Sequence, residues 1–120
     1  MVKKIVIAGC RNYSDYEEAK SFINLCLYEL HKEHTIVILS GTSSGADAIG
    51  ERYALENDFQ IEKYPADWKR FGRSAGPIRN KQMAENFDFA ICFWDGKSKG
   101  TKSMIDYVRK YGKYVIIKKI

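Results

Sequence analysis

The chain contains the segment Ile36-Val37-Ile38-Leu39-Ser40-Gly41-Thr42-Ser43-Ser44-Gly45-Ala46-Asp47, in which an apolar run passes through a glycine-containing turn into a helical pattern. The run at residues 36–39 is rich in β-branched side chains and is typical of a strand covered on both faces in a parallel sheet. After the turn, one apolar stripe at helical spacing contains Ala46, Ile49, Tyr53 and Ala54. A strand, a turn and a helix in this order predict one β-α unit of an α/β domain.

Strand-like and helical segments alternate along the rest of the chain. Runs of the same apolar character lie at residues 5–8, 89–93 and 114–117, and a weaker alternating segment at residues 59–64 predicts an edge strand. The first helical stripe comprises Ala19, Phe22, Ile23, Cys26, Leu27 and Leu30, preceded by Ser14 and Glu17 at capping-box spacing. A third helix is predicted from Pro77 to about residue 86. The fourth carries Thr101, Met104, Ile105 and Val108.

The order of these segments is β-α-β-α-β-α-β-α-β, which right-handed crossovers wind into an open parallel sheet with helices on both faces. We therefore predict a single Rossmann-like, three-layer α/β domain over residues 1–120, with five parallel strands in the order 3-2-1-4-5. In such sheets the ligand crevice lies beyond the carboxyl ends of the strands, at the switch point, here between strands 1 and 4. Residues 9–11, 40–45 and 94–101 follow strands and are expected at this edge.

Length and composition limit the class of protein. A chain of 120 residues fits one domain, and 45% hydrophobic with 29% charged residues is the composition of a globular protein. No apolar run approaches the ~20 residues of a membrane span, and the N-terminal run ends in Gly9-Cys10-Arg11 rather than at a signal-peptide cleavage site. We therefore expect no membrane partner and a cytoplasmic location. The 20 Lys and Arg against 15 Asp and Glu give a net charge of +5, which favours an anionic partner such as a nucleotide or nucleic acid.

The pattern of Cys and His residues predicts neither a disulfide framework nor a metal site. Cys10, Cys26 and Cys92 are widely separated and have no His at metal-ligand spacing. His31 and His34 lie near the end of a predicted helix, where solvated side chains are expected. The loop at residues 40–47 lacks the Gly-Lys-Ser/Thr of a P-loop and the Gly-x-Gly-x-x-Gly of a dinucleotide site. Redox dinucleotides and ATP hydrolysis are therefore disfavoured, and no cofactor or metal is expected.

Two strand-to-helix turns have the chemistry of phosphate sites. In the loop from Ser40 to Asp47, backbone N–H groups, hydroxyls and the helix dipole can converge on a phosphate. Asp95-Gly96-Lys97-Ser98-Lys99-Gly100-Thr101 is a second glycine-containing turn into a helix. A purely structural interpretation stays open for both, because Ser44 with Asp47 fits a capping box and Thr101 fits an N-cap. Two such turns beside one switch point favour a ligand that carries a phosphate.

The longest irregular stretch, residues 65–76, separates strand 3 from helix 3 and is rich in Arg, Lys and aromatic residues. Loops of this length in compact domains are often functional. The side chains that can donate bidentate hydrogen bonds to phosphate or carboxylate are Arg11, Arg73 and Arg79. The aromatic side chains that can stack on a base are Trp68, Phe71 and Trp94. For each residue taken singly, core packing or a surface ion pair explains its presence equally well.

Several of these motifs together resemble the DUF2493 group (YspA, cpYpsA-related) of the SLOG superfamily. The motifs are Gly9-Cys10-Arg11, the loop from Ser40 to Asp47, Pro65-Ala66-Asp67-Trp68, Ala75-Gly76-Pro77-Ile78-Arg79-Asn80-x-x-Met83 and Gly100-Thr101. SLOG proteins are similar to the DNA-processing Smf/DprA proteins and to the LOG phosphoribohydrolases. The resemblance implies a Rossmann-like fold and the binding or processing of nucleotide-derived ligands, frequently in bacterial and phage conflict systems. It also implies a homodimer, because related SLOG proteins are often dimers.

The resemblance to LOG enzymes bears on catalysis. Those enzymes use an Arg on the helix before strand 4 and a Glu just after the Gly-Thr pair to cleave the N-glycosidic bond of a nucleoside monophosphate. Arg79 matches the Arg, but the Glu is absent, because Thr101 is followed by Lys102, Ser103 and Met104. Cleavage needs a carboxylate beside the anomeric carbon. The carboxylates that could replace the Glu are Asp95, Asp47 and Asp67, and the candidate catalytic residues are Arg79 and Asp95.

The leading hypothesis is a protein that binds, and so senses or sequesters, a phosphorylated nucleotide- or ADP-ribose-derived small molecule. The predicted ligand-binding residues are Gly9, Arg11, Ser40, Gly41, Thr42, Ser44, Gly45, Asp47, Asp67, Trp68, Arg73, Arg79, Asn80, Trp94, Asp95, Gly100 and Thr101. One alternative is a LOG-like phosphoribohydrolase of nucleoside monophosphates. Another is DprA-like binding of DNA, which is less favoured because Lys and Arg are spread along the chain rather than gathered on one helix.

Overall fold

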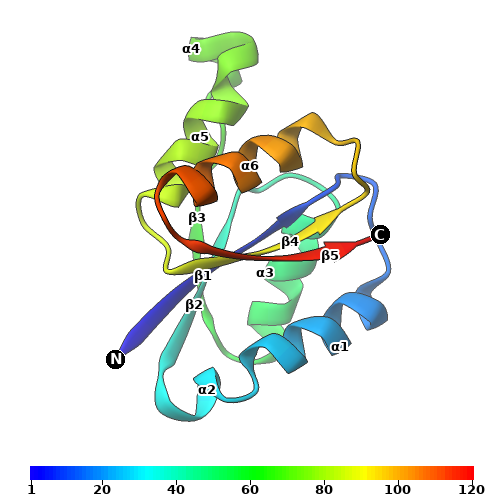
Figure 1. Ribbon diagram of the computed structural model, residues 1–120, viewed down its shortest axis with the longest axis vertical. Coiled ribbons are helices and arrows are strands. Elements are labelled where there is room, and N and C mark those ends of the chain that lie inside the picture. Colours follow the sequence, from blue (N-terminus) through cyan, green and yellow to red (C-terminus); the bar gives the residue numbers. More distant parts are fainter.

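One parallel sheet organises the computed structural model, which describes residues 1–120 (Figure 1). Its strands are β1 (Val2–Gly9), β2 (Thr35–Ser40), β3 (Gln60–Lys63), β4 (Phe89–Trp94) and β5 (Tyr114–Lys119). All neighbouring strands are parallel, and their order is β3-β2-β1-β4-β5. The predicted Rossmann-like α/β fold and its strand order are therefore confirmed. Because β1 pairs with both β2 and β4, the switch point of the sheet lies between β1 and β4.

Helices cover both faces of this sheet. The helical elements are α1 (Tyr16–Leu27), α2 (Leu30–Glu33), α3 (Ala46–Glu56), α4 (Trp68–Phe71), the 3-10 turn η1 (Gly72–Ser74), α5 (Ala75–Ala84) and α6 (Lys99–Lys110). The core on one face combines side chains of α1 and α3 with Ile5 and Ile7 of β1. The core on the other face combines side chains of α5 and α6 with Val6 and Ala8. Successive side chains of β1 therefore enter opposite cores, between helix pairs that Figure 1 shows on either side of the sheet.

Burial along the strands follows their place in the sheet. The central strands β1, β2 and β4 each contain an unbroken run of buried residues, as the apolar runs in the sequence predicted. β5 differs, because its apolar residues Val115, Ile116 and Ile117 are only half-buried. β5 is an edge strand with a single neighbour, β4. The expectation that this run is covered as fully as the other three is therefore wrong.

Two helices begin at caps other than the predicted ones. α1 is capped by Asp15, whose side chain accepts a hydrogen bond from the Glu18 amide at 3.1 Å, and not by Ser14. α6 is capped by Ser98, which accepts a hydrogen bond from the Thr101 amide at 3.3 Å, so Thr101 lies inside the helix. Ser, Asp and Thr are all good caps. The choice among neighbouring cap residues depends on which start lets the helix bury its apolar stripe.

Helix boundaries also differ from the prediction. α1 stops at Leu27, and Leu30 belongs to the separate turn α2. α5 begins at Ala75, two residues before Pro77, and ends at Ala84. The stretch predicted to be irregular contains the helical turns α4 and η1. The local signal for α4 is Asp67, whose side chain accepts a hydrogen bond from the Arg70 amide at 3.1 Å.

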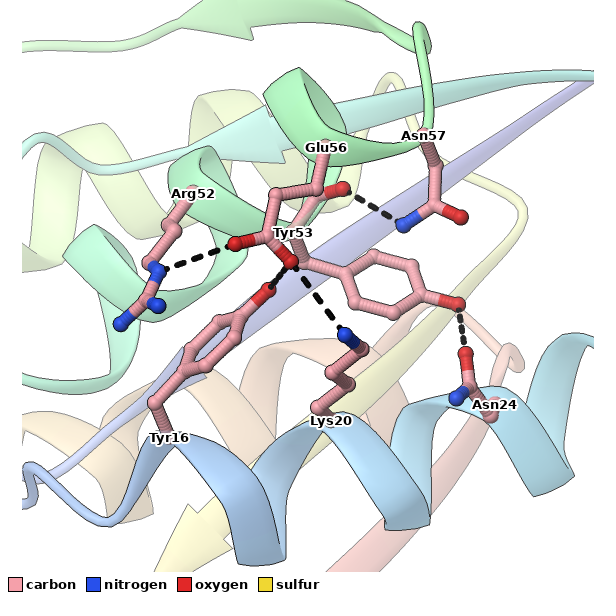
Figure 2. A network of polar contacts seen from close by, with 7 residues as sticks. All are labelled: Tyr16, Lys20, Asn24, Arg52, Tyr53, Glu56 and Asn57. Carbon is pink, nitrogen blue, oxygen red and sulfur yellow. Dashed lines mark hydrogen bonds and ion pairs between the residues drawn. The ribbon is translucent and has the colours of Figure 1, made fainter.

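A network of polar side chains joins α1 to α3 (Figure 2). Tyr16 donates a hydrogen bond to Glu56 Oε1 at 2.6 Å, and Tyr53 donates one to Asn24 Oδ1 at 2.6 Å. Arg52 forms an ion pair with Glu56 at 3.1 Å and lies over the Tyr16 ring. These contacts satisfy the phenol groups of two tyrosines whose rings are buried in the core. They also fix the orientation of α3, whose first turn borders the site described below.

Two expectations from the sequence concern membranes and metals. No helix in the structure combines the length and the apolar character that crossing a bilayer requires. Nowhere do three or more His, Cys, Asp or Glu side chains gather in an arrangement that could hold a metal ion. His31 is exposed and His34 is half-buried at the end of α2. The cysteines form no disulfide.

Candidate functional site

A cavity of about 480 Å³ opens at the carboxyl ends of β1 and β4. The end of β1 forms its floor, and the first turns of α3, α5 and α6 form its walls. This is the switch point at which the strand order predicts a ligand crevice. The lining residues are Ala8, Gly9, Cys10, Arg11, Asn12, Ser43, Asp47, Trp68, Gly76, Pro77, Arg79, Asn80, Met83, Asp95, Ser98, Lys99, Gly100, Thr101, Ser103 and Met104.

Gly9 lets three elements meet at the floor of the cavity. A Cβ atom at this position would overlap the carbonyl oxygen of Phe93 in β4 and would lie 2.9 Å from the Cβ of Ala46 in α3. The Cys10 amide donates a hydrogen bond to the Phe93 carbonyl at 3.1 Å, and the Cys10 carbonyl accepts one from the Ala46 amide at 3.2 Å. The end of β1 thus ties β4 to the start of α3 and brings the first turn of α3 to the cavity.

Arg79 of α5 is a buried cation with one free donor group. Its Nε donates a hydrogen bond to Asn80 Oδ1 at 2.9 Å, and its Nη1 donates one to the carbonyl oxygen of Gly41. The residue is 8% exposed, and its Nη2 makes no hydrogen bond within the chain but is accessible at the cavity wall. Burial lowers the pKa of the guanidinium, which still stays charged at neutral pH. A fixed, charged donor therefore faces the cavity.

Asp47, in the first turn of α3, is the buried anion of the same wall. It is 7% exposed, and its Oδ2 accepts a hydrogen bond from the Ser43 amide at 3.1 Å, whereas its Oδ1 accepts none within the chain. Burial raises the pKa of the Asp47 carboxyl to about 6, although the charges of Arg79 and Arg11 act to lower it. Asp47 and Arg79 do not form an ion pair. Each therefore keeps a hydrogen-bonding atom free for another group.

Gly41 allows these two charges to approach one another. A Cβ atom on Gly41 would lie 2.5 Å from Nη1 of Arg79 and 2.8 Å from Oδ2 of Asp47. Any side chain at this position would displace both groups. The loop after β2 thus holds both buried charges in place. Its Gly41 carbonyl accepts a hydrogen bond from Arg79, and its Ser43 amide donates one to Asp47.

The first turn of α6 contributes unpaired amides. Asp95 Oδ1 accepts hydrogen bonds from the amides of Ser98 and Lys97, both at 2.8 Å, and these bonds lower the pKa of Asp95. Ser98 caps the helix, and the amides of Lys99 and Gly100 make no hydrogen bond within the chain. Both of these residues line the cavity. Free amides at the positive end of the helix dipole favour an anion at this point.

Trp68 and Arg11 form the outer wall of the cavity. The Trp68 side chain is 50% exposed, and the guanidinium carbon of Arg11 lies 5.8 Å from the centre of its ring. Helix α4, which carries Trp68, lies at one end of the molecule, beyond the sheet (Figure 1). A half-exposed aromatic ring with a cation over it is suited to stacking on a nucleobase.

Sequence comparison assigns the chain to a family. The sequence model of the YspA, cpYpsA-related SLOG family matches residues 3–71, which is more than half of the chain. The chain belongs to this SLOG family. Gene 61 protein of Mycobacterium phage D29 is 30% identical over 122 residues, which cover 96% of this chain and 95% of the phage protein. The resemblance to the YspA and cpYpsA-related group is therefore confirmed.

Solved structures similar to this SLOG protein include two DNA processing proteins and a structural-genomics target. DprA from Helicobacter pylori has a TM-score of 0.66 at 23% identity, and the match covers 96% of the SLOG protein and 64% of that chain. DprA from Streptococcus pneumoniae has a TM-score of 0.70 at 20% identity, with 98% and 50% covered. The protein TM1055 has a TM-score of 0.67 at 18% identity, with 96% and 72% covered. At these identities the likeness shows the shared fold, and the SLOG protein spans only part of each DprA chain.

The cavity of the SLOG protein brings together many, but not all, of the predicted ligand-binding residues. Those that line it are Gly9, Arg11, Asp47, Trp68, Arg79, Asn80, Asp95, Gly100 and Thr101. The predicted residues that do not line it include Ser40, the last residue of β2, and Gly41, Thr42, Ser44 and Gly45 of the loop that follows. The Ser40 hydroxyl donates a hydrogen bond to Glu51 at 2.6 Å and accepts one from the Thr42 amide at 3.0 Å. The predicted capping box of Ser44 and Asp47 does not form, because the Ser44 hydroxyl donates to the Arg11 carbonyl and Asp47 bonds the Ser43 amide.

Other predicted residues do not line the cavity of the SLOG protein. Asp67 caps α4. Arg73 is exposed on η1. Trp94 packs against both cores and donates from its indole nitrogen to the Ser98 carbonyl at 3.1 Å. The bulk of Trp94 therefore supports the turn before α6, whereas Trp68 is the aromatic residue that reaches the cavity.

Several lining residues were missed by sequence reasoning. Met83 lies one helical turn after Arg79 on α5, and Met104 lies three residues after Thr101 on α6. Spacings of three or four residues place these side chains on the same helix face as their predicted neighbours, so helical periodicity was the available signal. Lys99 lies inside a turn that the sequence predicts as a phosphate site. Cys10 lies inside the segment 9–11 that was expected at this edge, but no local signal pointed to Asn12.

Proposed function

We propose that this SLOG protein binds a phosphorylated, nucleotide-derived small molecule, such as a nucleotide or an ADP-ribose derivative, and so senses or sequesters it. One observation carries the proposal: Nη2 of Arg79 and the amides of Lys99 and Gly100 are free donors on one cavity. Asn80 links the two groups, because its Oδ1 accepts from Arg79 and its Nδ2 lies 3.4 Å from the Gly100 carbonyl. A phosphate between them would receive charge-assisted hydrogen bonds from both.

The size and lining of the cavity suit the rest of such a ligand. A volume of about 480 Å³ lies in the range of small-molecule sites. The half-exposed Trp68 offers a face for a base, and Met83 and Met104 supply apolar surface. The cationic side chains of the lining, Arg11, Arg79 and Lys99, outnumber its carboxylates, Asp47 and Asp95. An anionic ligand with one aromatic part fits this balance.

Isothermal titration calorimetry against a panel of ligands tests the proposal. The panel contains ribonucleoside mono-, di- and triphosphates, ADP-ribose, the corresponding nucleosides and inorganic phosphate. We expect at least one phosphorylated compound to bind, and we expect its nucleoside and inorganic phosphate to bind more weakly, because each occupies one part of the cavity only. If no phosphorylated compound releases or absorbs heat at any tested concentration, the proposed function is wrong.

The same experiment distinguishes an enzyme from a binding protein. Asp47 and Asp95 both line the cavity, which provides carboxylates for a LOG-like hydrolase where the usual Glu is absent, while Asp67 lies outside. Chromatography of the titration mixtures detects free base if a nucleoside monophosphate is cleaved. We propose binding ahead of cleavage because no carboxylate occupies the position that follows Gly100-Thr101 in LOG enzymes.

A single-stranded oligonucleotide is added to the panel to test the DNA alternative. The structure of the Helicobacter pylori DprA was described for its binding of single-stranded DNA. In the SLOG protein the segment of α4 and η1 exposes Lys69, Arg70 and Arg73 beside Trp68. If these residues hold DNA, oligonucleotide affinity will exceed that of every nucleotide and will fall steeply with salt. Binding of nucleotides in preference to the oligonucleotide supports the cavity instead.

Substitution of Gly100 with alanine tests the helix start as the phosphate position. A Cβ atom at Gly100 would meet no protein atom within 4 Å, so the fold should tolerate the methyl group and gain slightly from the higher helix propensity of alanine. A phosphate seated on the amides of α6 would meet this methyl group. We therefore expect affinity to fall by about 10-fold, a loss on the order of one good hydrogen bond, while the unfolding midpoint stays equal or rises.

The control for Gly100→Ala is Lys110→Ala, at the opposite end of the same helix. It should leave affinity unchanged, because Lys110 does not line the cavity. Equal affinities of Gly100→Ala and the unmodified protein would place the phosphate elsewhere.

A further inference from the structure

We infer that Asp47 binds the 2′,3′-diol of a ribose, so that the cavity selects ribonucleotide-derived ligands over their deoxy counterparts. The inference rests on the proposed function and names the class of sugar that the ligand must carry. Free hydrogen-bonding atoms lie on the wall formed by α3 and α5. Arg79 offers a donor, Nη2, and Asp47 offers an acceptor, Oδ1, and both residues are more than nine-tenths buried.

The positions of these groups along the wall determine where each part of the ligand lies. Asn80 connects Arg79 to Gly100 on one side, through contacts of 2.9 and 3.4 Å. Gly41 connects Arg79 to Asp47 on the other side, since a Cβ there would touch both charged groups. The order along the wall is therefore Gly100, Arg79, Asp47. A phosphate held by Gly100 and Arg79 places the adjacent part of the ligand, which is its sugar, at Asp47.

The chemistry of Asp47 selects a neutral donor. A carboxylate accepts hydrogen bonds only, and it repels a phosphate. A cationic group on the ligand is disfavoured, because the positive charges of Arg79 and Arg11 already act on Asp47. A metal ion is disfavoured because no cluster of ligating side chains surrounds the residue. Hydroxyl groups are the neutral donors that a nucleotide carries next to its phosphate.

Two hydroxyls fit the acceptors that Asp47 has left. Oδ1 makes no hydrogen bond within the chain, and Oδ2 makes only the one to the Ser43 amide at 3.1 Å. Because each carboxylate oxygen can accept about two hydrogen bonds, a cis-diol can donate one bond to each oxygen. Removal of either hydroxyl leaves a buried acceptor without a partner, and a site built in this way discriminates strongly against the analogue that lacks the donor.

The test compares matched ligands on matched variants. The ligands are adenosine and guanosine 5′-monophosphates and ADP-ribose, each with its 2′-deoxy form, and the 3′-deoxy forms of the monophosphates. The proteins are the unmodified chain, Asp47→Asn and the control Asp106→Asn, which makes the same chemical change at an exposed position of α6. Calorimetry gives the ratio of ribose to deoxyribose affinity for each protein.

We expect the unmodified chain to prefer each ribose ligand by roughly 10- to 100-fold over either deoxy form, the range for a hydrogen bond to a charged group. Asp106→Asn should keep this ratio. Asp47→Asn should reduce it to about 3-fold or less, since an amide accepts a hydrogen bond with one oxygen only. The affinity for deoxy ligands should not fall in this variant, because the change removes a negative charge near the phosphate.

A pH series adds a measurement that would not change with pH if Asp47 had only a structural role. The ratio of ribose to deoxyribose affinity should shrink as the pH falls from 8 to 5, because the Asp47 carboxyl, whose pKa burial raises to about 6, takes up a proton. The charged or titratable groups that face it are Arg79 of α5, Arg11 after β1, Glu51 of α3 and Cys92 of β4. The phosphate also titrates in this range, but its effect cancels in the ratio.

The outcomes separate the inference from the proposed function. If ribose and deoxyribose ligands bind the unmodified chain equally, the inference is wrong and the proposed function stands. The same holds if Asp47→Asn keeps the full preference. If no nucleotide of either kind binds, the proposed function itself is wrong. Should Asp47→Asn fail to fold, the ratio on the unmodified chain and its decrease between pH 8 and pH 5 test the inference, which is wrong if the ratio is 1 or does not change with pH.

Discussion

Arg79→Met is expected to weaken the binding of a nucleotide by about 100-fold or more. Methionine preserves much of the apolar stem but removes every guanidinium donor, including Nη2, which faces the cavity. A charge-assisted hydrogen bond to a phosphate contributes roughly 1.5–3 kcal/mol, so loss of Nη2 together with its charge accounts for a factor of this order. Calorimetry of the variant against the nucleotide that binds best measures the effect.

The same substitution acts on the fold, and its controls separate the two effects. Loss of Nη1 leaves the Gly41 carbonyl without its donor, which should lower the free energy of unfolding by about 1–3 kcal/mol. Urea unfolding of each variant therefore accompanies the titrations.

Arg79→Lys should bind with intermediate affinity, because an ammonium keeps the charge but cannot hold Gly41 and a phosphate with one planar group. Arg73→Met should bind normally, because Arg73 does not line the cavity. A folded Arg79→Met protein of unchanged affinity would exclude Arg79 from the site.

The second large effect concerns stability: Asp47→Asn should raise the free energy of unfolding at pH 7.5 by roughly 1–3 kcal/mol. Burial raises the pKa of Asp47 from 3.8 to about 6, so the folded protein holds the ionised carboxylate at a cost. Asparagine has nearly the same shape and can still accept the hydrogen bond from the Ser43 amide, but it carries no charge to desolvate. Urea unfolding of both proteins at several pH values measures the difference.

The sign of the pH dependence follows from the direction of the shift. Between about pH 4 and pH 6 the folded chain binds a proton at Asp47 that the unfolded chain has released, because the folded pKa is the higher one. The unmodified protein therefore loses stability relative to Asp47→Asn as the pH rises through this window, and the difference is constant above it. Near pH 4 the two proteins should be similarly stable. Asp106→Asn makes the same chemical change at an exposed site and is measured beside it as the control. A constant difference at all pH values would contradict the raised pKa.

Together these two predictions concern a site in which a buried charged residue lowers the stability of the fold and contributes to ligand binding. Asp47 costs folding energy at neutral pH, but it holds its free oxygen on the cavity beside Arg79. Charged groups with shifted pKa values in a cavity are typical of functional sites. We therefore expect Asp47→Asn to be more stable and, for ribose ligands, to bind less tightly.

The sheet was predictable from sequence because its signals are local and repeated. The apolar runs of β1, β2 and β4 are long enough to be covered on both faces, and the helical stripes between them force parallel crossovers. The prediction failed at the ends of elements. At the start of α1 both Ser14 and Asp15 are acceptable caps, and at the start of α6 both Ser98 and Thr101 are. Which residue caps each helix depends on burial of the whole helix.

The site was predicted less completely for a related reason. Sequence reasoning located the strand ends and identified Arg79 and the start of α6, because glycine-containing turns and basic residues are visible in one dimension. It treated the loop after β2 as a phosphate loop, whereas of residues 41–45 Ser43 alone lines the cavity. Whether a loop amide faces a cavity or the interior depends on the path of the backbone. Gly45, for example, has a φ of 73° and packs against the Cys10 and Arg11 carbonyls.

The sequence alone was sufficient for the order of the elements, the order of the strands and the edge of the sheet that carries the cavity. Hydrophobic periodicity and the handedness of crossovers act on any chain with this pattern, and together they limit the strand orders that it can adopt. Only the tertiary structure places Arg79 beside Asp47. Arg79 and Gly41 are 38 positions apart, and their contact exists because the end of β2 and the first turn of α5 meet at one edge of the sheet. The raised pKa of Asp47 has the same origin, because desolvation depends on which residues surround a carboxyl in space.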